Sequence, residues 1–234
     1  MPKYVRVAGT WRDVTSPVVR QGGVWRDVQN GYARVADVWR ETYRRITYQI
    51  AVAHPNSPFV TAYPWSASGF GTKFSNPGTL PASNGHTVAF SPSGTAIAVG
   101  HNTTPFITAY SWSSSGFGTK FANPGTLPAN TGYDVAFSPS GTEIAVAHTI
   151  SPFITAYPWS ADGFGTKFAN PGTLPASHGF GVAFSPSGTE IAVAHSNSPF
   201  VTAYSWSASG FGTKFADPGT LPGGDGRGVA FNEL

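Results

Sequence analysis

Histidine is the residue type whose spacing in this chain comes nearest to a chemical site. Four of the six histidines recur at intervals of 47 residues, at His54, His101, His148 and His195. A metal ion needs its ligand atoms about 2 Å from one centre, whereas equivalent positions of a repeated ring lie much farther apart. We therefore expect these histidines to make structural contacts in turns, and we expect neither a metal site nor a cofactor.

The acidic residues show no recurrent pairing. Glu143 and Glu190 occupy equivalent positions of two repeats, but the other two repeats carry Gln49 and Ala96 there. A hydrolase with two carboxylates would need them about 5 to 10 Å apart. The sequence also contains no recognisable nucleophile–base–acid trio, phosphate-cradling loop or dinucleotide fingerprint. We therefore predict no catalytic residues and a protein that is not an enzyme.

One short segment differs more between the repeats than its surroundings do. His86, Tyr133, Phe180 and Arg227 occupy the same place in it, just before a short predicted strand. Three of these side chains are rings that can stack on a sugar face, and the arginine could hold an acidic group. We predict a candidate ligand-binding site there, near the rim of the central opening. The alternative is that a surface loop simply tolerates variation.

Tryptophan recurs with the same interval, at Trp65, Trp112, Trp159 and Trp206. These indoles could stack on sugar rings, one for each repeat. Packing between neighbouring repeats is the interpretation that we favour, because bulky and small residues alternate along the strands that carry them.

The elements that position these residues belong to a 47-residue unit that occurs four times between residues 48 and 234. A period of roughly 40 to 50 residues is typical of propellers and solenoids. The copy from 95 to 141 has four short strand-like runs, at 96–100, 106–112, 117–121 and 135–137, which are separated by turn residues. Four strands for each unit predict an all-β, four-bladed β-propeller. We expect the C-terminal strand, 228–234, to complete the first blade and close the ring.

A resemblance supports this fold. The stretch from Asp134 to His148, DVAFSPSGTEIAVAH, is similar to the hairpin between the innermost and second strands of WD-repeat propellers. The family's tryptophan position is matched by Trp112. The chain departs from the pattern at Ser140, which replaces an aspartate in the turn, and at Ser113, which follows the tryptophan. The resemblance implies the fold and says little about function.

Residues 1–47 form a separate β-hairpin repeat module with a period of 14 residues. They hold nine basic and four acidic residues, a net charge of +5, whereas the remainder has a net charge of −2. Each copy is predicted to be a strand, a tight turn and a strand, with Arg6 opposite Trp11. Such a small module buries little surface alone, so we expect it to mediate attachment or homo-oligomerisation. The candidate residues are Trp11, Trp25, Trp39, Arg12, Arg26 and Arg40.

These short repeats resemble a motif of bacteriophage tail and other virion proteins, V-[KR]-x-G-G-x-W-[KR]-x-V, most clearly over residues 19–28. The resemblance implies a non-enzymatic phage structural protein: a tail fibre, tail appendage or decoration protein that displays the propeller. Its partners would be other virion proteins, through residues 1–47, and a host-surface glycan. A soluble lectin with one glycan site for each blade and a WD-repeat-like interaction scaffold are the alternatives.

The composition limits the possible locations and partners of the protein. The chain has no cysteine, no apolar run of the roughly 20 residues that span a bilayer, and no visible signal peptide. Acidic residues follow Arg12, Arg26 and Arg40 directly, which argues against a nucleic-acid surface. We therefore expect a virion location, no nucleic-acid partner and no membrane insertion.

Overall fold

The computed structural model describes the backbone of six strands between residues 4 and 44, and residues 48–233 in full. The chain separates into two compact units, residues 1–48 and 49–234. The strands of the first unit are β1 (Tyr4–Val7), β2 (Thr10–Asp13), β3 (Val18–Gln21), β4 (Val24–Asp27), β5 (Asn30–Val35) and β6 (Val38–Arg44).

The first unit contains three two-stranded antiparallel sheets, β1-β2, β3-β4 and β5-β6. Arg6 pairs with Trp11 in the backbone register, and the equivalent positions pair in the other two hairpins. The predicted strand–turn–strand repeat is therefore confirmed. The side chains of residues 1–47, including the six candidate attachment residues, lie outside the described residues, and their role in attachment or oligomerisation stays a prediction.

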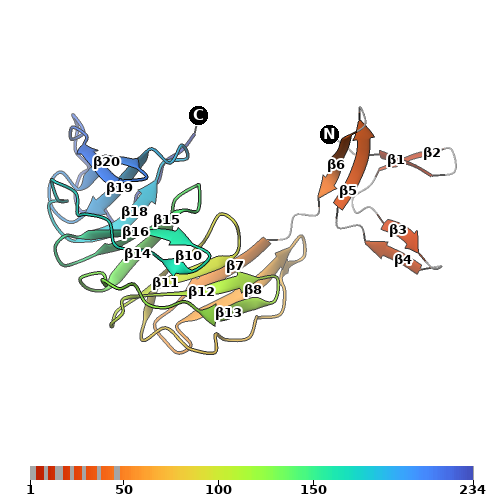
Figure 1. The fold of residues 1–234 in the computed structure, drawn as a ribbon, viewed down its shortest axis with the longest axis horizontal. Coiled ribbons are helices and arrows are strands. Elements are labelled where there is room, and N and C mark those ends of the chain that lie inside the picture. The colour runs from red at the N-terminus through yellow and green to blue at the C-terminus, as the bar shows by residue number, and fades with distance from the viewer. Residues whose placement is uncertain are drawn as a thin grey trace. The chain divides into compact units, whose positions relative to one another are not determined.

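The second unit consists of four antiparallel sheets in succession (Figure 1). The first contains β7 (Tyr48–Ala53), β8 (Val60–Ser66) and β9 (Gly69–Phe70). The second contains β10 (Gly85–Phe90), β11 (Ala96–His101), β12 (Ile107–Ser113) and β13 (Gly116–Lys120). The third contains β14 (Gly132–Phe137), β15 (Glu143–His148), β16 (Ile154–Ser160) and β17 (Gly163–Phe164). The fourth contains β18 (Gly179–Phe184), β19 (Glu190–His195), β20 (Val201–Ser207) and β21 (Gly210–Lys214).

This architecture confirms the predicted all-β, four-bladed β-propeller. The second, third and fourth blades each take their innermost strand, such as β14, from the end of one 47-residue unit and their other strands from the next unit. The part of the chain that the structure describes contains no helix that is long and apolar enough to cross a membrane.

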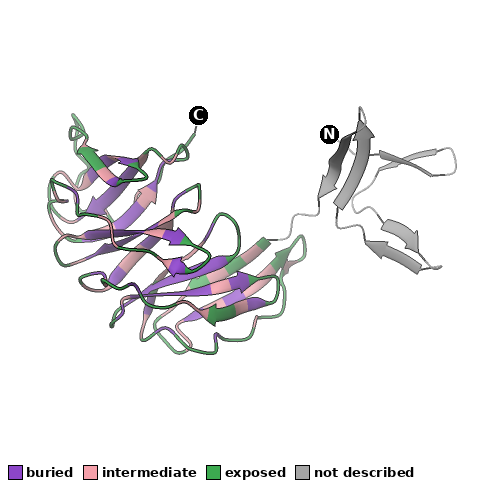
Figure 2. Ribbon diagram, in the orientation of Figure 1, coloured by how far each residue is buried: buried purple, intermediate pink, exposed green. Residues whose placement is uncertain are grey.

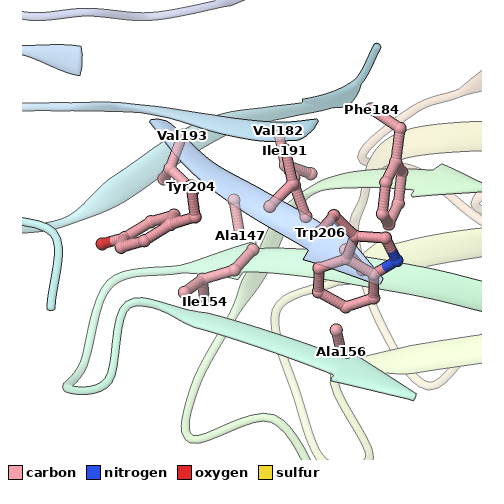
Figure 3. Packing of buried hydrophobic residues seen from close by; sticks show 10 residues of the cluster. Ala147, Ile154, Ala156, Val182, Phe184, Ile191, Val193, Tyr204 and Trp206 are labelled. Atoms are coloured by element: carbon pink, nitrogen blue, oxygen red, sulfur yellow. The ribbon is translucent and has the colours of Figure 1, made fainter. Parts of the chain in front are cut away.

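The blades stack through one bulky and one small face, as the alternation in the sequence predicts. Between the third and fourth blades, Ala147 and Ala156 of the third form one buried cluster with Tyr204 and Trp206 of the fourth (Figure 3). The same arrangement joins the second blade to the third. Figure 2 shows that buried residues run along the strands of the inner blades. Large side chains therefore fill the hollows that alanines leave on the neighbouring sheet.

Tryptophan and tyrosine make specific contacts across each junction between blades. Trp206 is 5% exposed and lies edge-to-face against Phe168 of the preceding repeat, with ring centroids 5.3 Å apart. The buried Tyr204 hydroxyl donates a hydrogen bond of 2.8 Å to the backbone carbonyl of Thr173. The packing interpretation of the repeated tryptophans is therefore confirmed for Trp112, Trp159 and Trp206. Trp65, in the first blade, is 40% exposed.

The predicted closure of the ring differs from the structure. Residues 228–233 form no strand, and the sheet of β7 contains only β8 and β9 besides it. The C-terminal segment instead packs on the fourth blade, where Gly228 lies against Gly181 of β18. A closed ring of four blades would require each blade to turn by about 90°. In the structure, β7 has no innermost strand on its free edge, and the C-terminal segment pairs with no strand.

Candidate ligand site on the inner strands

The four variable residues that the sequence singles out lie in one continuous row. The His86 and Tyr133 rings are stacked with centroids 4.8 Å apart, and Tyr133 meets Phe180 edge-to-face at 5.4 Å. The Arg227 guanidinium carbon lies 4.5 Å from the centroid of the Phe180 ring. We call these four residues the inner-strand row. The structure therefore brings together side chains that are 47 residues apart in sequence.

A glycine fixes the position of each residue in the row. Gly132 precedes Tyr133, and a Cβ atom placed on it would lie 2.6 Å from the Phe106 carbonyl oxygen, closer than any side chain tolerates. Phe106 itself has a φ of 67°, which turns its carbonyl toward the inner strand. The other three repeats show the same approach, at Gly85, Gly179 and Gly226. Only glycine allows the backbone to come this close, so the loop of one blade holds the row residue of the next.

His86 is held by an amide side chain. Its Nε2 atom is hydrogen-bonded to Oδ1 of Asn102, which directly follows the buried His101. The Asn102 backbone N–H donates to the carbonyl of Asn84, 3.3 Å away. Because an amide oxygen only accepts hydrogen bonds, Nε2 carries the proton in this pair. Nδ1 of His86 is then the ring nitrogen with a free lone pair.

A partly buried carboxylate, that of Asp134, directly follows Tyr133 of the row. Asp134 accepts hydrogen bonds of 2.9 Å each from the Thr87 hydroxyl, its neighbour's N–H at Val135, and the N–H of Val182. These donors come from three successive inner strands, β10, β14 and β18. Burial raises the pKa of Asp134, and its hydrogen bonds oppose that shift. Because its three donors come from three strands, the Asp134 carboxylate joins these strands to one another.

Three further side chains near the row were not predicted from the sequence. Asn102 contacts His86, His178 lies 6.2 Å from the Phe180 ring, and Asp225 forms an ion pair of 3.1 Å with Arg227. His178 and Asp225 are two residues before the row position of their repeats, and Asn102 follows a repeated histidine. The segment before the row position and the segment after the repeated histidine both vary between the repeats. This variation was the signal that could have indicated these residues. Nothing in the sequence indicated that the two segments touch.

Three of the four repeated histidines make structural contacts, as predicted, and His54 in the first blade is only partly buried. His101, His148 and His195 are fully buried, and each Nε2 is hydrogen-bonded to a threonine of the same blade at 2.8–2.9 Å. Nδ1–H of His148 also donates to the Ile150 carbonyl, at 2.8 Å. Burial lowers the pKa of His101 and of His148 from 6.5 to about 4, and it also lowers the pKa of His195. Neutral imidazoles therefore stabilise the ends of β11, β15 and β19, next to which the row residues lie.

Within the described residues, no group of three or more His, Cys, Asp or Glu side chains is arranged to hold a metal ion. A groove of about 520 Å³ does lie between the second and third blades, beside Trp159. It opens where Ala96 replaces the Gln49, Glu143 or Glu190 of the other repeats. Its lining is hydroxyl and apolar, with no charged or basic group. The inner-strand row is therefore the better candidate for chemistry.

Comparisons with known proteins identify the fold and leave the family open. No family model and no curated protein matches this sequence. Among solved structures, one described as a "putative 6-phosphogluconolactonase" from Bacteroides uniformis has a TM-score of 0.53 at 14% identity, over 79% of this chain and 62% of that one. A protein from Lactobacillus plantarum has a TM-score of 0.54 at 15% identity, over 85% of this chain and 66% of that one. The chain thus spans less than two thirds of either structure.

These comparisons contradict the function predicted from the sequence. The fold is shared with a structure described as an enzyme, and no comparison points to a bacteriophage component. The prediction of a non-enzymatic phage structural protein is therefore wrong, and so is the prediction that the protein is not an enzyme. The lectin and scaffold alternatives find no support in the comparisons either. The phage interpretation rested on the resemblance of the short repeats in residues 1–47 alone.

Proposed function

We propose that the protein binds a small anionic sugar derivative along the inner-strand row and hydrolyses its lactone ring. The observation that carries this proposal is the order of side chains in the row: an imidazole fixed by an amide, two aromatic rings, and then a guanidinium. This order provides a base, a surface for a sugar ring and a charge for an acidic group, within one set of contacting residues.

The aromatic rings in the middle of the row suit a sugar ring. Tyr133 and Phe180 are partly exposed, and they meet edge-to-face, so their faces are differently oriented. Aromatic faces bind the apolar C–H surface of sugars. Arg227, whose side chain is 70% exposed, is paired only with the neighbouring Asp225 among the described residues. A phosphate or carboxylate of the ligand could replace that weak surface ion pair, because guanidinium binds both groups in a bidentate manner.

His86 would supply the base. With its Nε2–H donating to Asn102, the Nδ1 atom can take a proton from a water molecule. The resulting hydroxide adds to the lactone carbonyl carbon, and the tetrahedral intermediate collapses by breaking the ring C–O bond. The proton held on Nδ1 returns to the departing alkoxide oxygen. The products are one hydroxy acid and the regenerated imidazole, with water as the only other reactant.

The likeness in fold to a structure described as a putative 6-phosphogluconolactonase agrees with this reaction class. At 14% identity, that likeness supports the choice of a first substrate and nothing finer.

The test is hydrolysis of 6-phosphogluconolactone and of unphosphorylated gluconolactone, measured by acid release above the spontaneous rate. We expect His86→Gln to lower kcat by about 100-fold or more for both substrates. Arg227→Gln should raise KM for the phosphorylated lactone and leave KM for the unphosphorylated lactone unchanged. Lys73→Gln, which removes an exposed cation from another part of the propeller, is the matched control and should leave both parameters unchanged. Hydrolysis no faster than in buffer, or full activity of His86→Gln, would overturn the proposal.

A further inference from the structure

Each junction between blades in this chain repeats the same contacts. The bulky face of one blade covers the small face of the blade before it, and an aromatic residue of the earlier repeat meets the next tryptophan. The ring centroids are 5.4 Å apart for Phe74 and Trp112, and 5.1 Å apart for Phe121 and Trp159. The junction is therefore a defined interface that the chain forms three times, once between each pair of successive blades.

The bulky face of the first blade lacks this covering. Ile50 is 36% exposed, Val52 is 45% exposed and Trp65 is 40% exposed. The equivalent residues of the second blade are Ile97, Val99 and Trp112, and none of them is more than 5% exposed. β7 is also an edge strand, because its sheet lacks the innermost strand that the other three blades have.

The fourth blade also lacks a neighbour, because no further blade of the chain packs against its small face. Phe215, the equivalent of Phe74 and Phe121, is 48% exposed and meets no tryptophan among the described residues. The segment 226–231, GRGVAF, is equivalent to the innermost strands β10, β14 and β18, and it already lies against β18 at Gly181. It has no strand partner in the described part of the chain. The fourth blade thus has a spare innermost segment beside it, and the first blade lacks an innermost strand.

We propose that two copies of this chain join these ends, so that residues 226–231 of each copy pair with β7 of the other. The pairing between β10 and β11 gives the register directly: Ala89 opposes Ala98, so Ala230 of one copy opposes Ala51 of the other. Trp65 then meets Phe215, as Trp112 meets Phe74. The Tyr63 hydroxyl reaches the carbonyl of Thr220, as that of Tyr110 reaches Thr79.

Two copies are the number that fits a closed propeller. β-Propellers typically have four to eight blades, and two copies of four blades give eight, while three copies would exceed that range. In a single chain, the three junctions leave one edge of β7 free and the segment 226–231 without a strand partner. Joining two copies buries the exposed bulky face and removes both free edges, which otherwise favour aggregation.

Cysteine cross-linking tests this assembly cleanly, because the chain contains no cysteine. Full-length Ala51→Cys and full-length Ala230→Cys are mixed, oxidised with diamide and separated without reductant. We expect a covalent dimer from the mixture and from neither variant alone. The internal pair Ala89→Cys with Ala98→Cys, in one chain, is the positive control, because these residues are already opposed. No cross-link in the mixture, while the control pair forms, overturns the proposal.

A second measurement separates this contact from assembly through residues 1–47. Phe215→Asp should abolish the cross-link and lower the mass measured by light scattering from twice 24.5 kDa. Ile150→Asp, at a 50% exposed apolar residue of a loop outside both end faces, should change neither. A chain that carries both Ala51→Cys and Ala230→Cys distinguishes the alternative closure. A cross-linked monomer from that chain would overturn the two-copy assembly in favour of a ring closed within one chain.

Discussion

Replacing the buried His148 should change how the stability of the propeller depends on pH. Burial lowers the pKa of this imidazole from 6.5 to about 4, and its two nitrogens are occupied by Thr155 and the Ile150 carbonyl. Below pH 6.5 the unfolded chain binds a proton at His148, but the folded chain does not until about pH 4. The contribution of His148 to the free energy of unfolding is therefore fully present above pH 6.5, and it is lost as the pH falls toward 4. The full difference is about 3 kcal/mol for this one histidine.

Urea unfolding followed by tryptophan fluorescence measures this effect. Between pH 7 and pH 5 the contribution of His148 should fall by about 2 kcal/mol, since one unit of pKa difference corresponds to about 1.4 kcal/mol. His148→Gln should be less stable than the wild type at pH 7, and it should lose about 2 kcal/mol less on acidification. His178→Gln, at an exposed histidine, serves as the control and should keep the wild-type pH dependence. An unchanged pH dependence in His148→Gln would refute the assignment of a buried, neutral imidazole.

Two further substitutions test how the inner-strand row is built. Gly132→Ala should destabilise the protein by more than about 1 kcal/mol, because the new Cβ would collide with the Phe106 carbonyl, and thermal unfolding should show this loss. Gly125→Ala has open space around the new methyl group, and equal melting temperatures of the two variants would speak against the close approach. Asp134→Ala leaves partly buried donors of three strands without their acceptor and should cost about 1 to 3 kcal/mol in urea unfolding. Asp162→Ala, at an exposed aspartate, should cost little, and a similar loss from both would remove the special role of Asp134.

The fold was predictable because bulky and small residues alternate along each strand and so indicate its two faces. The alternation around Tyr110 and Trp112 predicts a bulky side, and the alanines of the preceding strand predict the hollow that receives the next blade. The structural contacts of His101, His148 and His195 were predictable because these residues lie at the ends of equivalent strands.

The site and the ends of the propeller were predictable only in part. The row residues stood out by their variation, but the contact between His86 and Asn102 depends on how a strand and a loop meet in space. The positive φ of Phe106, which sets the close approach to Gly132, has no signal in a phenylalanine. The angle between neighbouring blades depends on the packing of many side chains at once. For that reason the sequence could identify residues 228–234 as the equivalent of an innermost strand and still mispredict their pairing with β7 in one chain.

The most direct test of the central claim is a titration of the full chain with 6-phosphogluconate, the product of the proposed reaction, followed by ¹H–¹⁵N NMR. We predict saturable shifts in the amides of residues 84–87, 131–133, 178–180 and 225–227, and their loss in Arg227→Gln. These residues come from four separate places in the sequence and meet only at the inner-strand row. Saturable shifts confined to other parts of the propeller, or no shifts at millimolar ligand, would contradict the account.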